Sequence, residues 1–211
     1  LKAYGIGEEI TNWLKHFLTD RMQQVNINGK GSKWHKVTSG IPQGSVIGPL
    51  LFITYINDLP GNVKSTIYMF ADDTKIFNII QTEMDKDVLQ KDLEELTKWT
   101  DKWLLKLHPQ KCKSMHIGKA DINQEFKYEL MGFKLDYVQE EKDIGLAIDN
   151  QLTFNTHITE KIKKASSISA MIRRIFQHLD EKTFTPLYKA LVRTHLEYAS
   201  SAWAPYKAKY I

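Results

Sequence analysis

The sequence Thr-Ile-Tyr-Met-Phe-Ala-Asp-Asp-Thr-Lys-Ile-Phe-Asn-Ile-Ile occupies residues 66–80. Two runs rich in β-forming residues, 66–70 and 74–80, flank the adjacent acids Asp72 and Asp73. Two such runs joined by a tight connection predict a β-hairpin with both carboxylates at its tip. Neighbouring side chains on a strand point to opposite faces. The backbone twists at a tip, however, so one or both carboxylates can reach a single pocket.

Two adjacent anions at the end of an apolar strand need charge compensation. Their burial costs free energy unless a cation or hydrogen bonds offset it. Mg²⁺ prefers carboxylate and phosphate oxygens, and two such ions about 3.5–4 Å apart stabilise both oxygens of a phosphoryl transfer. Asp72 and Asp73 are therefore candidate metal ligands. The alternative is a solvated Asp-Asp turn, because aspartate is a common turn residue.

A glycine-rich loop, Ser-Gly-Ile-Pro-Gln-Gly-Ser at residues 39–45, precedes this hairpin. Its glycines allow the backbone to approach a ligand closely. Ser45 can cap the following helix, which is predicted to run to about Asp58. The N–H groups of a helix start favour phosphate or another anion, and Gln43 offers an amide to a nucleotide or a template strand. Taken alone, the loop is equally a well-capped helix start.

The remaining patterns predict an α+β fold, with an antiparallel sheet followed by a helical appendage. Asn28-Gly29 is a predicted hairpin turn, and Asp180 is the predicted cap of the last helix. The other predicted helices cover 8–18, 83–106, 155–177 and 181–200, and the other strands cover 23–28, 34–38, 114–117, 127–131, 134–138 and 143–148. The helix over 83–106 is expected to bury Met84, Val88, Leu89, Leu93, Leu96, Trp103 and Leu104.

The composition suits a globular protein of one or two domains, because 42% of the 211 residues are hydrophobic and 26% are charged. The single cysteine, Cys112, cannot form an internal disulfide, which fits a nuclear or cytoplasmic compartment. The longest apolar run, 46–56, is interrupted by polar residues, glycine and proline and is too short to span a bilayer. No basic-then-apolar stretch begins the sequence, so no secretion signal is expected. We therefore expect no membrane partner, and no oligomeric state is predicted.

The net charge of +4 is unevenly distributed. Residues 155–211 contain ten basic and four acidic side chains, for a net charge of +6, whereas residues 1–154 contain 19 basic and 21 acidic ones, for −2. A basic C-terminal part beside a near-neutral body favours contact with a polyanion. A solvated helical face is the alternative. The change of charge places a candidate domain boundary at 151–155.

Several segments together closely resemble the reverse transcriptases of non-LTR retrotransposons. The three most specific are Ser-Gly-Ile-Pro-Gln-Gly-Ser-Val-Ile-Gly-Pro-Leu-Leu-Phe at 39–52, Tyr-Ile-Asn-Asp-Leu-Pro at 55–60 and Phe-Ala-Asp-Asp-Thr at 70–74. Four more segments of this family pattern lie at 101–103 with 108–113, at 141–149, at 196–199 and at 203–206. The likeness covers essentially the whole chain.

The resemblance implies a fold and a reaction. Residues 1–152 would be an incomplete polymerase palm, an antiparallel sheet with helices on one face, and residues 153–211 a helical thumb-like region. The reaction would be RNA-directed DNA synthesis, in which a primer 3′-hydroxyl attacks the α-phosphate of a deoxynucleoside triphosphate. The implied partners are an RNA template and a DNA primer, and the implied cofactors are two Mg²⁺ ions, with Mn²⁺ as a substitute.

The resemblance also implies roles for individual residues. Asp72 and Asp73 would bind the catalytic metal, and Phe70 stands where many relatives have tyrosine. Lys111 matches a lysine suspected of protonating the leaving pyrophosphate, a role that suits a proton donor beside developing negative charge; the alternative is an ordinary surface lysine. Pro42, Gln43 and Gly44 would shape the nucleotide and template pocket, Lys142 to Gly145 would support the primer end, and Lys161, Lys163, Lys164, Arg173 and Arg174 would contact the template–primer backbone.

The chain departs from the family pattern in one respect that bears on activity. The family takes another metal-binding aspartate from an earlier strand, and none of Glu8, Glu9 and Asp20 fits that role. The fingers, the first metal-binding strand and any endonuclease domain are therefore expected upstream of Leu1, and the chain alone is expected to be inactive. The alternatives are a non-catalytic nucleic-acid-binding remnant of a retrotransposon and an inert structural fragment.

Overall fold

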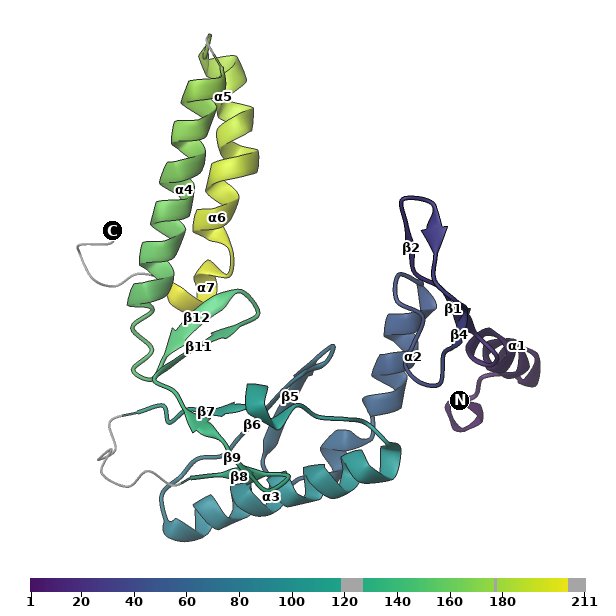
Figure 1. Ribbon diagram of the computed structural model, residues 1–211. Coiled ribbons are helices and arrows are strands. Elements are labelled where there is room, and N and C mark those ends of the chain that lie inside the picture. The colour runs from purple at the N-terminus through teal and green to yellow at the C-terminus, as the bar shows by residue number, and fades with distance from the viewer. Residues whose placement is uncertain (119–126, 177, 205–211) are drawn as a thin grey trace. The chain divides into compact units, whose positions relative to one another are not determined.

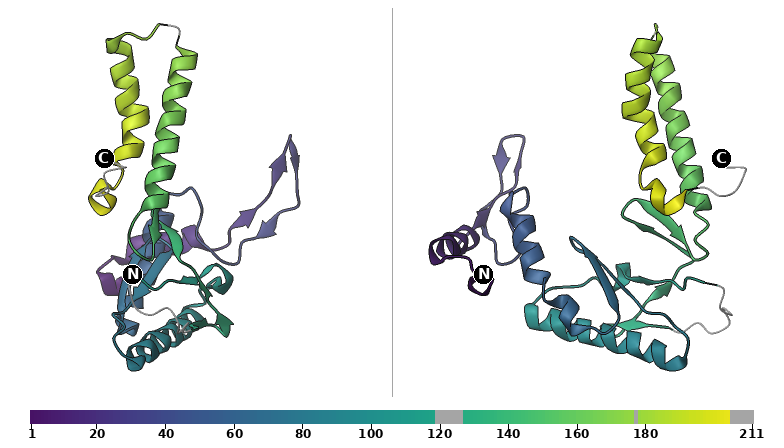
Figure 2. Two further views of the ribbon diagram at one scale, coloured as in Figure 1. Left: turned by 90° about the vertical axis from the view of Figure 1, so that its left-hand side faces the viewer. Right: turned by 180° about the vertical axis from the view of Figure 1, so that it is seen from behind.

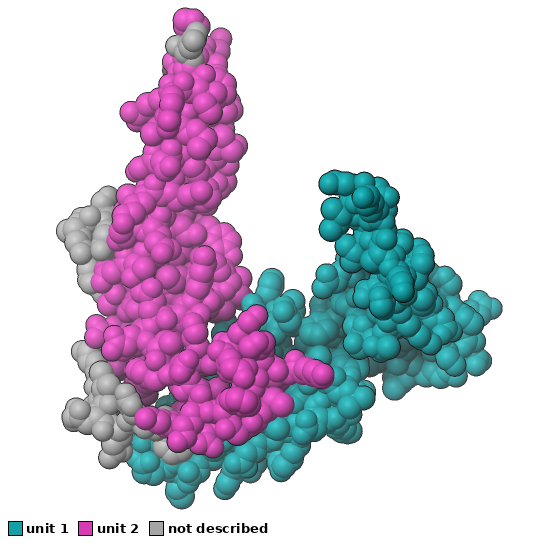
Figure 3. Space-filling model, in the orientation of Figure 1, with its two compact units in different colours: residues 1–105 teal, residues 106–211 magenta. Residues whose placement is uncertain are grey.

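The computed structural model describes residues 1–118, 127–176 and 178–204 (Figure 1). Contacts divide the chain into two compact units, residues 1–105 and 106–211, which Figure 3 colours separately. Helices and short strands occur in both units, so the predicted α+β class is confirmed. The predicted boundary at 152/153 lies inside the second unit, and the division into palm and thumb stays a prediction.

The first unit opens with a short 3-10 turn, η1 (Lys2–Tyr4), and α1 (Glu8–Leu18), whose bounds are those predicted. Two small antiparallel ladders follow: β1 (Met22–Gln23) pairs with β4 (His35–Lys36), and β2 (Asn26–Ile27) with β3 (Lys30–Gly31). The turn between β2 and β3 is Asn28-Gly29, with φ of 51° and 79°, as predicted.

The strand predicted at 23–28 is divided between β1 and β2, and the strand predicted at 34–38 is present but confined to β4. Between the two ladders, the N–H of Val25 donates to the hydroxyl of Ser32 at 3.1 Å, and the Ser32 N–H donates to the Val25 carbonyl at 2.8 Å. Because a side chain replaces a backbone acceptor there, the regular ladder is interrupted and splits into two short pieces.

The glycine-rich loop leads into α2 (Ile47–Ile56), which is followed by the 3-10 turn η2 (Leu59–Asn62). The hairpin of β5 (Thr66–Phe70) and β6 (Asp73–Phe77) comes next, in the predicted antiparallel pairing. β6 starts one residue earlier and ends three residues earlier than the predicted run. In the described residues, β5 and β6 pair only with each other.

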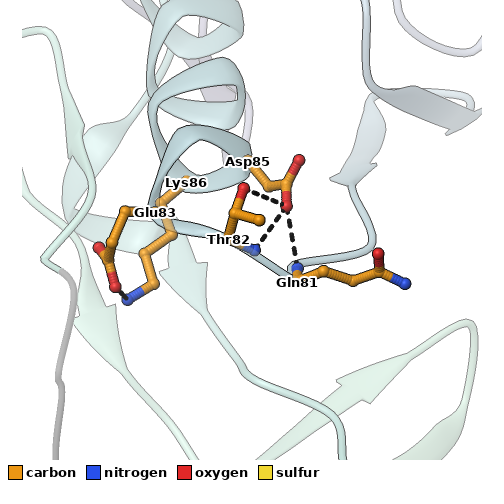
Figure 4. Close-up of polar contacts among 5 residues, drawn as sticks. All are labelled: Gln81, Thr82, Glu83, Asp85 and Lys86. Atoms are coloured by element: carbon orange, nitrogen blue, oxygen red, sulfur yellow. Dashed lines mark hydrogen bonds and ion pairs between the residues drawn. The ribbon is translucent and has the colours of Figure 1, made fainter.

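A long helix, α3 (Glu83–Trp103), ends the first unit. Thr82 and Asp85 form a capping box at its start, in which the Asp85 carboxylate accepts the N–H groups of Gln81 and Thr82 at 3.0 and 2.7 Å (Figure 4). Figure 4 also shows the ion pair of Lys86 with Glu83, 2.7 Å long. The helix stops at Trp103 because Leu104 adopts a left-handed conformation with φ 55°.

The buried stripe of α3 agrees with the prediction in part, and Val88, Leu89 and Trp103 are half-buried. Leu93 and Leu96 are buried, but Met84 is 74% and Leu104 88% exposed. The prediction is wrong for Leu104 because the helix has already ended there, and it is wrong for Met84, which lies in the first turn of the helix. The stripe also contains residues outside the prediction, Asp92, Trp99 and Thr100.

The second unit contains six short strands and one 3-10 turn, η3 (Pro109–Lys111), among its described residues. β7 (Lys113–Ser114) pairs in parallel with β10 (Asp136–Tyr137), and β8 (Glu129–Leu130) pairs with β9 (Phe133–Lys134). The longest ladder joins β11 (Glu140–Asp143) to β12 (Leu146–Asp149). The single strand predicted at 143–148 is therefore wrong, because Ile144 and Gly145 have positive φ and reverse the chain.

The predicted single antiparallel sheet is also wrong for the described part of the chain. The strands form six separate two-stranded ladders, one of them parallel. Most of these strands are two residues long, and the five-residue strands β5 and β6 likewise have no second neighbour in the described residues. The α+β class holds, but the continuous sheet does not appear.

Helices make up the rest of the second unit: α4 (Asn155–Ile175), α5 (Glu181–Leu187), the π-helix η4 (Tyr188–Arg193), α6 (Thr194–Glu197) and α7 (Ser200–Trp203). The two views of Figure 2 show α4 lying alongside the segment from α5 to α6. Ala165, Ile172 and Val192 are buried between them. The predicted ends at Gln177 and at 205–206 lie outside the described residues.

The helix predicted over 181–200 begins where it was predicted to begin, but it is not continuous. The Asp180 carboxylate caps α5 by accepting the Thr183 N–H at 2.8 Å. The predicted single helix to residue 200 is interrupted at Tyr198 and Ala199, and Ala199 has φ of 53°. Among the described residues, no helix has the length and apolar character needed to cross a membrane.

Candidate functional site

The two candidate metal ligands lie at the β5–β6 turn. Phe70 and Asp73 form the last residue pair of the ladder, so Ala71 and Asp72 make the turn itself, with Ala71 at φ 53°. Asp72, Asp73 and Phe70 are all exposed. Both carboxylates are therefore accessible to a ligand, and their role as metal ligands stays a prediction.

The hairpin presents two different faces. Ile67, Met69 and Ile76 are half-buried on one face. Cross-strand partners share a face, so Asp73 lies on the other face with Phe70, which is 61% exposed. The same face has further exposed rings away from the turn, where Tyr68 and Phe77 stack with centroids 5.5 Å apart.

The loop over 39–45 is held by the Ser45 side chain and by Arg21, which lies shortly after α1. The Ser45 hydroxyl donates to the Pro42 carbonyl at 2.7 Å and accepts the Gly48 N–H at 3.0 Å, so Ser45 caps an N–H in the first turn of α2 from one residue before the N-cap position, Val46. Gly40 and Gly44 have φ of 83° and 78°, so the loop needs glycine at both positions. Gly48 is buried, and a Cβ there would lie 2.8 Å from Ser45 Oγ and 3.0 Å from the Pro42 carbonyl oxygen.

An open groove of about 620 Å³ adjoins this loop. Arg21 lines the groove and donates from Nη2 to the Gly40 carbonyl at 2.7 Å and from Nε to the Leu18 carbonyl at 3.3 Å. The sequence patterns predict no role for Arg21, although it lies three residues after α1 and is the one charged residue among the described residues that line the groove. The groove is lined by Arg21, Met22, Gln23, Val37, Ser39, Gly40, Ile41, Pro42 and Gln43. Two of the three residues predicted to shape the nucleotide and template pocket, Pro42 and Gln43, thus line one groove, and Gly44 follows them directly.

The remaining predicted site residues belong to the second unit. Lys111 ends η3 and is exposed. Lys142 is exposed on β11, and Gly145 lies in the β11–β12 turn with φ of 80°. Beside Lys142, Glu141 accepts an ion pair from Lys113 at 2.8 Å, and this contact holds the pKa of Glu141 below its ordinary value.

The basic residues of α4 are positioned for contact with a polyanion. Lys163, Lys164, Arg173 and Arg174 are exposed, while Lys161 is half-buried with its ammonium 5.6 Å from the centre of the Tyr198 ring. None of the five makes an ion pair with another described residue. Their charge is therefore not offset by a neighbouring carboxylate in the part of the chain that is described.

Two acids that were not among the predicted site residues bind backbone N–H groups, one in the segment before β5 and one in the segment after β12. Asp92 is 3% exposed and accepts the N–H groups of Lys64 and Ser65 at 2.9 and 2.7 Å. Asp149, at the end of β12, accepts the N–H groups of Gln151, Thr153 and Phe154 at 3.0, 3.0 and 2.6 Å. For Asp92, the signal in the sequence was a charged residue on the apolar stripe of a helix.

Comparison with known proteins places the chain in a family. A family described as reverse transcriptase (RNA-dependent DNA polymerase) matches residues 1–135, a range that contains both the 39–45 loop and the β5–β6 turn. The RNA-directed DNA polymerase from mobile element jockey of Drosophila funebris is 28% identical over 213 residues, which cover 92% of this chain and 22% of that protein.

Two further relatives come from Drosophila melanogaster. The probable RNA-directed DNA polymerase from transposon BS is 28% identical over 200 residues, covering 86% of this chain and 21% of that protein. The RNA-directed DNA polymerase from mobile element jockey is 28% identical over 155 residues, covering 69% of this chain and 17% of that protein. The chain spans about a fifth of the length of these relatives.

No solved structure gives a significant match. The family match covers more than half of the chain, and the relatives are polymerases of non-LTR retrotransposons, as the sequence motifs predict. The chain belongs to the reverse transcriptase (RNA-dependent DNA polymerase) family.

Proposed function

We propose that this chain is the palm and thumb part of an RNA-directed DNA polymerase of a non-LTR retrotransposon. Its substrates are an RNA template, a DNA primer and deoxynucleoside triphosphates. The observation that supports this proposal most is the family match over 1–135, within which Asp72 and Asp73 occupy an exposed β-turn. The relatives are themselves named RNA-directed DNA polymerases.

The donor set at the β5–β6 turn fits magnesium. Asp72 and Asp73 offer hard carboxylate oxygens, and Mg²⁺ is commonly held by one or two carboxylates together with water and substrate phosphates. A pair of bound ions would neutralise the charge that develops on the attacking and leaving oxygens of phosphoryl transfer. In the described residues, no third acidic, histidine or cysteine side chain joins them. A further carboxylate must therefore come from outside this set.

The other predicted residues act on substrate and nucleic acid in this proposal. Gln43 and Pro42 line the groove in which the template or the incoming nucleotide is oriented. Lys111 donates a proton to the leaving pyrophosphate. The β11–β12 turn, with Lys142 and Gly145, supports the primer end, and the α4 cations contact the phosphate backbone.

Primer extension tests the catalytic part of the proposal. For the chain of 211 residues alone we expect no extension with Mg²⁺ or Mn²⁺, because two carboxylates at one turn leave the metal pair without its bridging ligand. A chimaera in which this chain replaces the matched stretch of the Drosophila funebris jockey protein is expected to extend a primer. Asp72→Ala and Asp73→Ala in the chimaera are expected to abolish extension.

The matched control is Asp87→Ala, which removes an exposed aspartate of α3 and is expected to leave extension unchanged. Extension by the chain alone that disappears in Asp72→Ala would overturn the expected inactivity. Extension by the chimaera that survives Asp72→Ala would overturn the metal-binding role.

The exposed, unpaired cations of α4 favour one other function, a non-catalytic nucleic-acid-binding remnant. Such a remnant differs from the polymerase in whether its binding depends on the metal. A remnant binds an RNA–DNA hybrid with strong salt dependence and no response to Mg²⁺, whereas the polymerase proposal requires binding of a nucleotide at the primer end to depend on the metal and on Asp72.

A further inference from the structure

The turn between β11 and β12 is made of two residues in left-handed backbone conformations. Ile144 has φ of 43° and Gly145 has φ of 80°. Positive φ is ordinary for glycine but rare for a β-branched residue such as isoleucine. A conformation of this kind persists only where the surrounding structure holds it. The contacts around Ile144 therefore show what holds the turn.

Tyr198 holds this turn from a segment 54 residues further along the chain. Its hydroxyl donates a hydrogen bond of 2.8 Å to the Ile144 carbonyl. Its ring lies against Gly145, where an added Cβ would be 3.4 Å from Tyr198 Cε1. Tyr198 follows α6 directly, where the chain leaves its helical path. Both turn residues thus touch one side chain.

Tyr198 is itself fixed by Trp203. The indole Nε1 of Trp203 donates to the Tyr198 carbonyl at 2.7 Å, and Trp203 is 7% exposed. Its ring packs edge-on against His157, with centroids 5.2 Å apart. His157 Nδ1 accepts the Ala147 N–H of β12 at 3.2 Å. The segment 198–203 is therefore connected to the same hairpin at two places, its turn and its second strand.

Two ammonium groups belong to the surroundings of the turn, together with the carboxylate of Asp143, which ends β11. The Lys161 ammonium stands 5.6 Å from the centre of the Tyr198 ring, which is within the range of cation–π attraction. Lys142 is exposed on β11, two residues before the turn. Phosphate contacts come mainly from such cations, so these two ammonium groups favour a nucleic-acid backbone near the turn.

We infer that Tyr198 is a positioning residue for the primer end, which it serves by holding the Ile144–Gly145 turn through its hydroxyl. This inference rests on the proposed function, in which that turn supports the primer. It assigns to the segment 198–203 a task distinct from that of the α4 cations. Those cations contact backbone phosphates anywhere along a duplex, whereas a single fixed turn contacts one place, the primer terminus.

Tyr198→Phe tests the inference because it removes the hydroxyl and keeps the ring. Binding of the 211-residue chain is measured by fluorescence anisotropy to two RNA–DNA hybrids of equal length. One has a recessed DNA 3′ end, and the other has both ends closed by hairpin loops and so has no primer terminus. Tyr188→Phe is the matched control, because Tyr188 lies in the same unit and no described residue hydrogen-bonds its hydroxyl.

The unaltered chain is expected to prefer the hybrid with the recessed end. Tyr198→Phe is expected to reduce affinity for that hybrid about three- to tenfold, the effect of one hydrogen bond, and to leave affinity for the closed hybrid unchanged. Amide hydrogen exchange in 144–146 is expected to accelerate in the same variant. A general loss of structure would instead weaken both hybrids together, so the ratio of the two affinities separates positioning from folding.

The possible failures are distinguishable. A chain that binds neither hybrid overturns the proposed function, and the inference with it. A chain that binds both hybrids equally, or whose preference survives Tyr198→Phe, overturns the inference and leaves the proposed function standing. Unchanged hydrogen exchange in 144–146 also overturns it, because the hydroxyl then does not hold the turn.

Discussion

The carboxylate of Asp92 in α3 accepts the backbone N–H of Ser65 at 2.7 Å, directly before β5 begins. The same carboxylate accepts the N–H of Lys64 at 2.9 Å. A helix that starts after the acidic hairpin thus holds the segment that enters it. Five residues of β5 then lead from this anchor to the turn that carries Asp72. The direction of the hairpin is therefore tied to the long helix of the first unit.

Asp92→Ala is expected to destabilise the protein by about 3 kcal/mol, because it leaves two N–H groups without their charged acceptor in a buried place. Chemical denaturation followed by tryptophan fluorescence measures this change. Asp101→Ala, at an exposed position of the same helix, is the control and is expected to change the free energy of unfolding by less than about 0.5 kcal/mol. Equal effects of the two substitutions would show that Asp92 does not anchor β5.

Acid is expected to weaken the second unit through Asp149. Burial alone would raise the pKa of Asp149, but hydrogen bonds from the N–H groups of Thr153, Phe154 and Gln151 outweigh it and hold the pKa below its ordinary value. Because the folded pKa lies below the unfolded one, the contribution of Asp149 is complete above about pH 4 and is lost as the pH falls through the folded pKa. Denaturation at pH 7 and at decreasing pH below 4 measures it.

Asp149→Asn is the informative variant for this pH dependence. It is expected to lower stability at pH 7 and to make the loss below pH 4 less steep, since one titrating group is gone. Asp136→Asn, at an exposed strand position of the same unit, is the control. If the stability of Asp149→Asn falls as steeply below pH 4 as that of the unaltered chain, the prediction is contradicted.

Gly48→Ala is expected to displace the 39–45 loop. The added Cβ would lie 2.8 Å from Ser45 Oγ and 3.0 Å from the Pro42 carbonyl, and the second of these atoms is backbone that cannot rotate away. Crowding of this kind costs about 1–3 kcal/mol. Thermal unfolding measures the cost, and primer extension by the chimaera described above measures the effect on the groove.

Gly61→Ala is the matched control for that substitution, because nothing lies within 4 Å of a Cβ at Gly61 and its φ is not positive. It is expected to leave both readouts unchanged. If Gly48→Ala also leaves them unchanged, the spacing of the Pro42–Ser45–Gly48 contacts does not govern the loop.

Removal of two α4 charges is expected to change the salt dependence of nucleic-acid binding. Lys163→Gln together with Lys164→Gln should lower the slope of log K against log salt by about 2, because each phosphate contact contributes about 0.9 to that slope. Lys15→Gln is the control, because Lys15 is an exposed residue of α1, and it should leave the slope of log K against log salt unchanged. If the slope of log K against log salt is the same in the double variant as in the unaltered chain, the two lysines do not contact phosphates.

Local residue preferences were sufficient to predict several elements before the structure was known. The Asn28-Gly29 turn, the Asp180 cap, the Ser45 cap and the bounds of α1 depend on neighbours within a few residues, and the structure confirms each of them. The family was likewise evident from the motifs at 39–52, 55–60 and 70–74. Turns, caps and motifs of this kind can be predicted because they depend only on residue types and on their spacing along the chain.

The errors concern places where the chain reverses or breaks. Ile144 and Ala199 have positive φ against the ordinary preference of their residue types, so no local pattern predicts the β11–β12 turn or the end of the last long helix. The contact of Tyr198 with Ile144 overrides that preference, and it joins residues 54 positions apart. The sequence by itself thus determined the family, the acidic turn and the glycine-rich loop. Only the tertiary structure decided what holds them, because hydrogen bonds such as those of Asp92 and Tyr198 join residues whose proximity arises only on folding.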